Sequence, residues 1–262
     1  MFYYFCSVSC EIHSPDEFKE IINSKSSEIR RCFKDYKNGL LEDSTTLPGT
    51  EGIKIRKSID VKKLRLLAGD LKEQGKFFES LFIYKVSYDE SFARCDGAEM
   101  AHCIYDMTNA IRSASMENDG SYVSTQCKGT AEEALKFIDQ LHLAAESKWN
   151  YKAMCLHGIG TLHCKLGDHD RAISKHDQAI ALMDKCSDVV KNTVLYGDCF
   201  NDKGVSLIRQ RRYKHALRCF RASIDTYKKA TDFSCEEEKD DKLKRTKRNL
   251  KAAKNLKECV IL

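Results

Sequence analysis

The feature that most constrains the fold of this chain is a set of small residues that recurs in three stretches of the sequence. The stretches align when Gly75, Gly167 and Arg211 are placed in one column. Three further columns then hold only small side chains: Ala68, Gly160 and Gly204, then Ser80, Ala172 and Ala216, then Ser87, Ala179 and Ser223. Because small side chains let two helices approach closely, each stretch is predicted to form a helical hairpin around a tight turn.

Larger side chains occupy other columns of the same alignment and are predicted to fill the space between the helices. These columns hold Leu64, Leu156 and Phe200, then Leu71, His163 and Leu207, then Phe77, His169 and Tyr213, and finally Tyr84, His176 and Phe220. A hairpin of this kind cannot bury its apolar face alone, so the copies are expected to stack on one another.

This pattern resembles the tetratricopeptide repeat, a family of helix–turn–helix units, over roughly residues 60–230. The chain departs from the family in lacking the usual Trp and the Pro after the second helix, and in its longer period. Gly160 and Gly204 are 44 residues apart, and Ala68 and Gly160 are 92 apart, which is twice 46. The doubled spacing predicts a fourth, degenerate unit between the first and second recognisable copies.

We therefore expect a helical repeat domain over residues 59–232, with units near residues 61–94, 98–147, 153–186 and 197–230. The second unit is predicted to contain helices at 98–116 and 130–147, joined by a polar loop. An N-terminal segment, residues 1–58, is expected to hold one helix at 14–38, and residues 233–262 a basic C-terminal helix. The resemblance implies an all-α fold, a right-handed α-solenoid of antiparallel helix pairs closed by a C-terminal capping helix.

Composition narrows the class of protein. The 262 residues include 44 Lys and Arg against 39 Asp and Glu, and this net charge of +5 is too mild to indicate nucleic-acid binding. The 13 cysteines are odd in number, irregularly spaced and mostly inside helical patterns, and no secretory signal is evident. We therefore expect a reduced, cytoplasmic protein without a nucleic-acid partner.

The resemblance also implies a concave groove lined by the first helix of each pair. Its candidate peptide-binding residues are Lys62, Arg65, Lys72, His157, Lys165, Asn201 and Arg209. Basic and amide side chains can hold an acidic or extended segment through charge-assisted hydrogen bonds. The subclass that binds chaperone tails uses Lys and Asn where this chain has Arg65 and Gly69, so a co-chaperone is not predicted. We expect a non-enzymatic scaffold or adaptor that binds a protein or peptide, with an acidic segment favoured.

The C-terminal helix carries eight basic side chains and no acidic one between Lys242 and Lys257. Its apolar stripe is formed by Leu243, Leu250, Ala253 and Leu256. We expect the stripe to cover the last repeat and the charges to face water.

The last four residues, beginning at Cys259, fit the C-a-a-X prenylation motif, and the terminal Leu262 favours geranylgeranyl. A prenyl chain beside a polybasic helix would attract an anionic membrane surface. The alternative function is therefore a prenylated peripheral membrane adaptor.

A third alternative, from another class, is a metal-binding protein or enzyme that uses the third unit. This unit contains Cys155, His157, His163, Cys164, His169 and His176. Cys155, His163 and Cys164 do not share a helix face at ligand spacing, and three of the histidines replace Leu or aromatic residues of the sister units. Packing explains them better, and no phosphate loop, serine-hydrolase elbow or carboxylate pair is evident. We predict no catalytic residue, no cofactor and no metal ligand.

Overall fold

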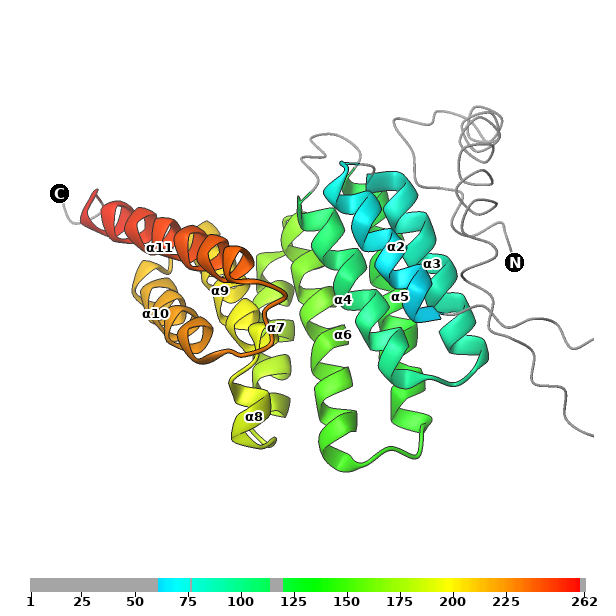
Figure 1. Cartoon of the computed structure of the whole chain (residues 1–262). Helices are drawn as coiled ribbons and strands as arrows, with labels where there is room; N and C mark the ends of the chain where they lie inside the picture. The colour runs from blue at the N-terminus through cyan, green and yellow to red at the C-terminus, as the bar shows by residue number, and fades with distance from the viewer. Residues whose placement is uncertain (1–60, 76, 114–119, 260–262) are drawn as a thin grey trace, which may run out of the picture. The chain divides into compact units, whose positions relative to one another are not determined.

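The computed structural model describes residues 61–75, 77–113 and 120–259, and within these ranges the chain is helical, with no strand (Figure 1). The chain divides into two units, Met1–Gln126 and Cys127–Leu262. The helix predicted at 14–38 lies outside the described residues. An all-α fold is confirmed for the part of the chain that the structure describes.

The first unit contains α2 (Val61–Glu73), α3 (Phe77–Ala93) and α4 (Gly97–Ser113). Helices α2 and α3 form a hairpin, and α4 packs against both. Two of the predicted small residues tie the hairpin together, because Ser80 Oγ donates to the Ala68 carbonyl at 2.7 Å and Ser87 Oγ donates to the Val61 carbonyl at 3.1 Å. The close approach that the small columns predicted is thus present in this hairpin.

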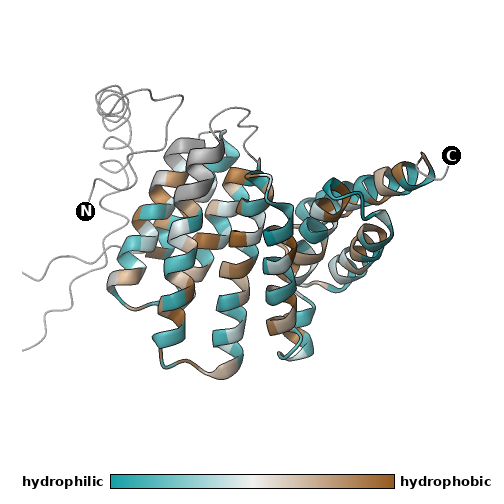
Figure 2. Cartoon of the chain, turned by 180° about the vertical axis from the view of Figure 1, so that it is seen from behind, coloured by the Kyte–Doolittle hydropathy of each residue, from teal (hydrophilic) through white to brown (hydrophobic). Residues whose placement is uncertain are grey.

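The second unit holds two further hairpins and a terminal helix, and α5 (Gly120–Gln140) crosses the boundary between the units. Helices α6 (Ala145–Lys165) and α7 (His169–Met183) form the first hairpin, followed by the short α8 (Asp188–Lys191). Helices α9 (Val194–Arg209) and α10 (Tyr213–Lys229) form the second, and α11 (Glu236–Cys259) packs on α10. Because α7 also packs against α9, the hairpins stack. Figure 2 shows polar and apolar residues interspersed along these helices, as amphipathic helices require.

Glycine is needed where an aromatic ring of one helix meets the backbone of its partner. A Cβ on Gly160 would lie 2.8 Å from His176 Cε1, and a Cβ on Gly204 would lie 2.7 Å from Phe220 Cε1. Both distances are shorter than ordinary van der Waals contacts, so each helix pair could not approach as closely with a larger residue. The columns of small and large residues therefore correspond to one packing scheme.

The aligned turn residues share a backbone conformation. Gly75, Gly167 and Arg211 have φ angles of 75°, 78° and 59°. After the turn at Gly167, Asp168 N donates to the His163 carbonyl at 2.9 Å, and after Arg211, Arg212 N donates to the Leu207 carbonyl at 2.9 Å. These bonds close the preceding helix in the manner of a Schellman motif. Arg211 thus takes a left-handed conformation that glycine adopts at lower cost.

The helices of the second predicted unit begin and end elsewhere than expected. Helix α4 ends at Ser113, α5 runs from Gly120 to Gln140 rather than over 130–147, and α6 already begins at Ala145. In α5 the buried residue Cys127, inside the polar stretch, continues the buried stripe of Ala131, Ala134 and Ile138. Burial of this stripe outweighs the weak helix propensity of the Ser-, Thr- and Gly-rich sequence before it. The division into four repeat units stays a prediction.

Candidate functional site

The groove residues predicted on α2 lie in the first unit. Lys62 is exposed, whereas Arg65 and Lys72 are half-buried. Arg65 Nε lies 3.1 Å from Glu99 Oε2, and Arg65 Nη1 lies 2.7 Å from Asp106 Oδ2. Arg65 therefore links α2 to α4 through two ion pairs.

The groove residues predicted in the second unit differ in their accessibility. Lys165 and Arg209 are exposed in the last turns of α6 and α9. His157 and Asn201 are 0% and 2% exposed. The assignment of His157 and Asn201 to an accessible groove is thus corrected, because neighbouring helices cover both side chains.

The same repeat position is covered in the same way in three helices. Arg65 contacts α4, as described above, and His157 contacts Cys199 and Asp202 of α9. Asn201 Oδ1 accepts hydrogen bonds of 3.2 Å from Thr246 Oγ1 and Asn249 Nδ2 of α11. Each residue thus faces the next helix of the stack, and α11 covers α9 as α9 covers α6.

Helix α11 is fastened to α9 and α10 by a buried ion pair. Lys242 Nζ donates to both carboxylate oxygens of Asp198, at 3.0 and 2.7 Å, and Tyr227 Oη donates to the same carboxylate. Burial, together with the Asp198 charge, raises the pKa of Tyr227 well above its usual value. The prediction that the basic residues of this helix face water is wrong for Lys242, which is buried with its partner.

The apolar stripe of α11 packs as predicted over most of its length. Ala253 is fully buried, and Leu243 and Leu250 pack on buried residues of the preceding helices. Leu256 is the exception, with 41% of its surface exposed. The stripe therefore covers the last hairpin but does not extend to the end of the helix.

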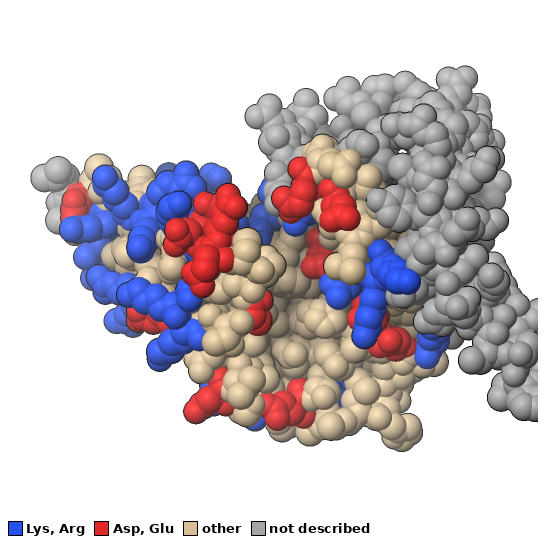
Figure 3. Space-filling view, in the orientation of Figure 1, with Lys and Arg blue, Asp and Glu red and all other residues tan. Residues whose placement is uncertain are grey.

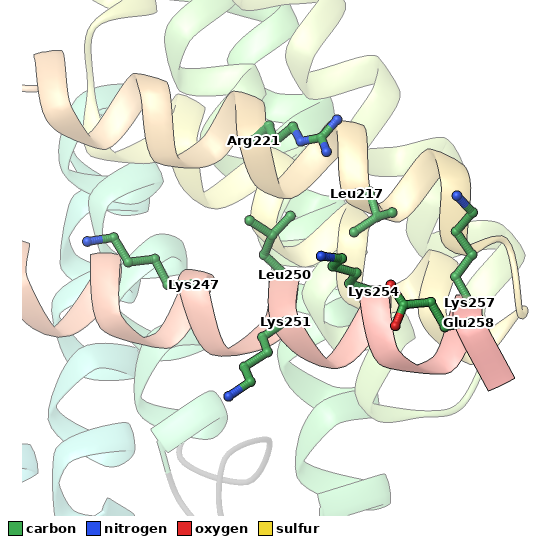
Figure 4. A pocket seen from close by; sticks show the side chains of 8 residues that line it. All are labelled: Leu217, Arg221, Lys247, Leu250, Lys251, Lys254, Lys257 and Glu258. Atoms are coloured by element: carbon green, nitrogen blue, oxygen red, sulfur yellow. The ribbon is translucent and has the colours of Figure 1, made fainter.

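A basic groove of about 370 Å³ lies between α10 and α11. Its lining consists of Leu217, Arg221, Lys247, Leu250, Lys251, Lys254, Lys257 and Glu258. Figure 4 shows Leu217, Leu250 and Lys254 between the two helices, with the other charged side chains around them. Figure 3 shows Lys and Arg gathered on the surface that α10 and α11 form. We call this site the α10–α11 groove; sequence reasoning missed it because its two walls come from separate helices.

Comparison with protein families matches one hairpin directly. A family model described as tetratricopeptide repeat matches residues 197–231, which span nearly all of α9 and all of α10. Helices α9 and α10 form a tetratricopeptide repeat. The α6–α7 hairpin shares the packing scheme of this tetratricopeptide repeat, with Gly160 and His176 in the positions of Gly204 and Phe220.

Comparison with solved structures supports the fold as a whole. The crystal structure of BtubC (BKLC) from P. vanneervenii is similar to this chain with a TM-score of 0.52. The match covers 80% of this chain and 77% of that chain at 14% sequence identity, so it shows the fold alone. No curated protein matches the sequence.

The Cys and His residues of the α6–α7 hairpin occupy different environments. His163 Nδ1 lies 3.6 Å from Asp168 Oδ2, and burial lowers the His163 pKa. Burial raises the pKa of the Cys155 thiol to about 12, so this thiol is neutral at neutral pH. His157 and His176 instead converge with a residue that sequence reasoning did not consider, Cys199 of the tetratricopeptide repeat.

The remaining sequence-predicted site is the C-terminal cysteine. Cys259 is exposed and is the last residue of α11. The three residues that complete the C-a-a-X motif lie outside the described residues. Within those residues, no helix is both apolar enough and long enough for a bilayer crossing.

Proposed function

We propose that this chain is a non-enzymatic, cytoplasmic protein-interaction scaffold whose α10–α11 groove binds an acidic segment of a partner protein. The observation that carries the proposal is the lining of the groove, where five cationic side chains and one carboxylate surround two leucines. The groove adjoins a tetratricopeptide repeat, a type of unit used to build extended binding surfaces.

The chemistry of the groove selects its ligand. Lys251 and Lys254 are exposed and can form charge-assisted hydrogen bonds with carboxylates. Leu217 and Leu250 offer an apolar floor for a side chain such as Leu or Phe. A segment with acidic residues on both sides of an apolar one therefore suits the site, and its affinity should fall as salt screens the charges.

The exposed cations on the first helices of the hairpins give each unit a candidate contact of its own. Lys165 and Arg209 end two neighbouring helices of the second unit, and Lys62 is exposed in the first unit. We retain Lys165 and Arg209 as candidate groove residues of the second unit. In the first unit we retain Lys62 together with Lys72, which is half-buried and pairs with Glu73 at 2.9 Å. Arg65 is less suited to this role because its charge is already paired with two carboxylates.

Fluorescence anisotropy with a labelled synthetic peptide tests the proposal. The probe is a ten-residue segment in which Glu pairs flank Leu, and the control peptide replaces each Glu with Gln. We expect Lys251→Glu/Lys254→Glu to weaken binding at least about tenfold, since two favourable contacts become repulsive. The matched variant Lys228→Glu/Lys229→Glu changes the net charge equally at exposed sites outside the groove. Equal weakening by both variants, or no preference for Glu over Gln, would refute the assignment.

A second candidate, the prenylated peripheral membrane adaptor, rests on the exposed Cys259 beside the same cations. One prenyl chain alone anchors weakly, and a polybasic surface supplies the additional attraction to anionic lipids. The test is the intact mass of the chain expressed in eukaryotic cells, together with its membrane fraction. Loss of the last three residues with gain of an isoprenoid and a methyl group supports the anchor. Unchanged membrane association of Cys259→Ser refutes it.

A further inference from the structure

We propose that His157, His176 and Cys199 bind a zinc ion inside the second unit. The three residues come from α6, α7 and α9, and each is fully buried. One ligand atom from each lies within 4.8 Å of the other two. Imidazole nitrogen and cysteine sulfur are the donors that zinc prefers in proteins.

The spacing of one donor pair, His157 and Cys199, fits a tetrahedral ion. With bonds of about 2.3 Å to sulfur and about 2.05 Å to nitrogen, two tetrahedral ligands lie about 3.6 Å apart. His157 Nδ1 and Cys199 Sγ are 3.6 Å apart. The rings of His157 and His176 are 5.3 Å apart between centroids and tilted by 49°, so they do not stack face to face. Three protein ligands leave the fourth position to a water molecule.

A carboxylate lies on the far side of His157. Asp202 Oδ2 is 3.9 Å from Nε2, the ring nitrogen that does not face Cys199. Asp202 is itself held by Thr161 Oγ1 at 3.1 Å and by Asn201 Nδ2 at 2.8 Å. Metal-bound histidines commonly direct their second nitrogen toward such a carboxylate, which favours the tautomer with a lone pair on Nδ1. Asp202 would therefore orient His157 toward the ion.

Packing alone does not account for the chemistry of the cluster. In the tetratricopeptide repeat, Phe220 fills the position of His176 and lies over Gly204 as His176 lies over Gly160. An aromatic hydrocarbon thus suffices for the space, so packing does not require an imidazole at this position. The position of His157 likewise holds Asn201 in the next hairpin, so neither histidine is required by the fold.

Binding requires that the Cys199 thiol lose its proton. Cys199 is a buried free cysteine, and the thiolate rather than the thiol is the metal ligand. On binding, the S–H bond breaks, the proton passes to solvent, and the thiolate donates an electron pair to Zn²⁺.

The test uses the purified full chain, stripped with a chelator and then loaded with zinc or, as a spectroscopic substitute, cobalt(II). Zinc content is measured by mass spectrometry, and a thiolate-to-cobalt charge-transfer band reports the sulfur ligand. We expect Cys199→Ala to remove one equivalent of zinc and the band that comes from this site. Cys155→Ala, which removes another fully buried thiol outside the cluster, should retain both.

His176→Phe keeps the protein testable if Cys199→Ala fails to fold, because it installs the residue of the sister hairpin. Circular dichroism should show native helix content while one equivalent of zinc is lost. Zinc at about 100-fold over its dissociation constant should raise Tm by about 5–10 °C in the wild-type chain, but not in this variant. Asp202→Asn should weaken zinc binding about 10- to 100-fold.

Two results would overturn the proposal. One is a stripped wild-type chain that takes up no zinc. The other is equal zinc content and equal thermal stabilisation in the wild-type chain, Cys199→Ala and His176→Phe, which would place bound zinc elsewhere in the chain.

Discussion

Two successive layers of the second unit follow one packing scheme with different chemistry. In the layer of α6, α7 and α9, the buried polar groups include His157, His176 and Cys199. In the layer of α9, α10 and α11, Asn201 and Phe220 hold the positions of His157 and His176, and the Asp198–Lys242 ion pair lies about one turn earlier in α9. Both layers place an aromatic ring over a glycine, His176 over Gly160 and Phe220 over Gly204.

The difference shows that the repeat fixes which positions are buried but not what the buried groups do. At the end of the stack, a charge on α11 meets a charge on α9, and this pairing specifies how the capping helix docks. Between the two hairpins, the buried polar groups include the proposed zinc ligands His157, His176 and Cys199 instead.

The largest effect is expected at the ion pair. Lys242→Met leaves the fully buried Asp198 carboxylate without its main counter-charge, and removal of one partner of such a pair costs about 3–5 kcal/mol. Urea unfolding followed by circular dichroism measures the loss. The double variant Asp198→Asn/Lys242→Met should be more stable than Lys242→Met alone. A loss below about 1 kcal/mol for Lys242→Met would show that the pair does not hold α11.

A smaller loss is expected when the glycines beneath the rings are enlarged. Gly160→Ala and Gly204→Ala would each cost about 1–3 kcal/mol, because the new Cβ overlaps an aromatic ring. Gly129→Ala is the matched control in α5, where an added Cβ meets nothing within 4 Å, and it should gain about 0.5–1 kcal/mol. Thermal unfolding compares the three. Stabilisation of all three variants would contradict the shared packing scheme.

A substitution in one of the turns is expected to increase the stability of the chain rather than decrease it. Arg211 has a φ of 59°, whereas its counterpart Gly167 has the residue suited to this conformation. Arg211→Gly should therefore stabilise the chain by about 0.5–1 kcal/mol. Chemical denaturation provides the measurement, and Arg212→Gly, at a neighbouring position without positive φ, serves as control. Destabilisation by Arg211→Gly would mean that the turn is held by the arginine side chain.

The smallest effect on stability is expected from the protonation of His163. Burial and the positive charges of Lys128 and Arg171 lower its pKa, while Asp168 acts in the opposite direction. Since the folded pKa lies below the unfolded value of about 6.5, the unfolded state binds more protons as pH falls, and stability decreases from pH 7.5 to 5.5. His163→Leu, which copies Leu71 and Leu207, should reduce this decrease. Unfolding curves at both pH values measure this decrease. An equal decrease in stability in the wild-type chain and in His163→Leu would contradict the prediction.

Sequence reasoning found the features that are local to a hairpin. The small residues, the aromatic partners and the left-handed turns recur at fixed spacing, because each hairpin solves the same packing problem. The stripe of α11 was likewise visible from its spacing, apart from the exposed Leu256. These features can be predicted without knowing how a hairpin packs against the next one.

Features that depend on the next helix were missed. His157 and Asn201 occupy positions that the family resemblance assigns to a groove, but α9 and α11 cover them. Lys242 looks like one of many solvated charges until Asp198, 44 residues earlier, is placed beside it. Spacing within one helix cannot reveal such a contact, since it depends on the register between stacked hairpins.

The equivalence of the α6–α7 hairpin and the tetratricopeptide repeat α9–α10 underlies both the proposed scaffold function and the proposed zinc site. The most direct test is the unfolding free energy of metal-free His176→Phe. This substitution gives the α6–α7 hairpin the ring that Phe220 supplies in α9–α10. Equivalence predicts that the variant unfolds cooperatively with a stability within about 1 kcal/mol of the wild-type chain, because Gly160 leaves room for the ring. A loss of more than about 3 kcal/mol would contradict it, since the two hairpins would then pack by different rules.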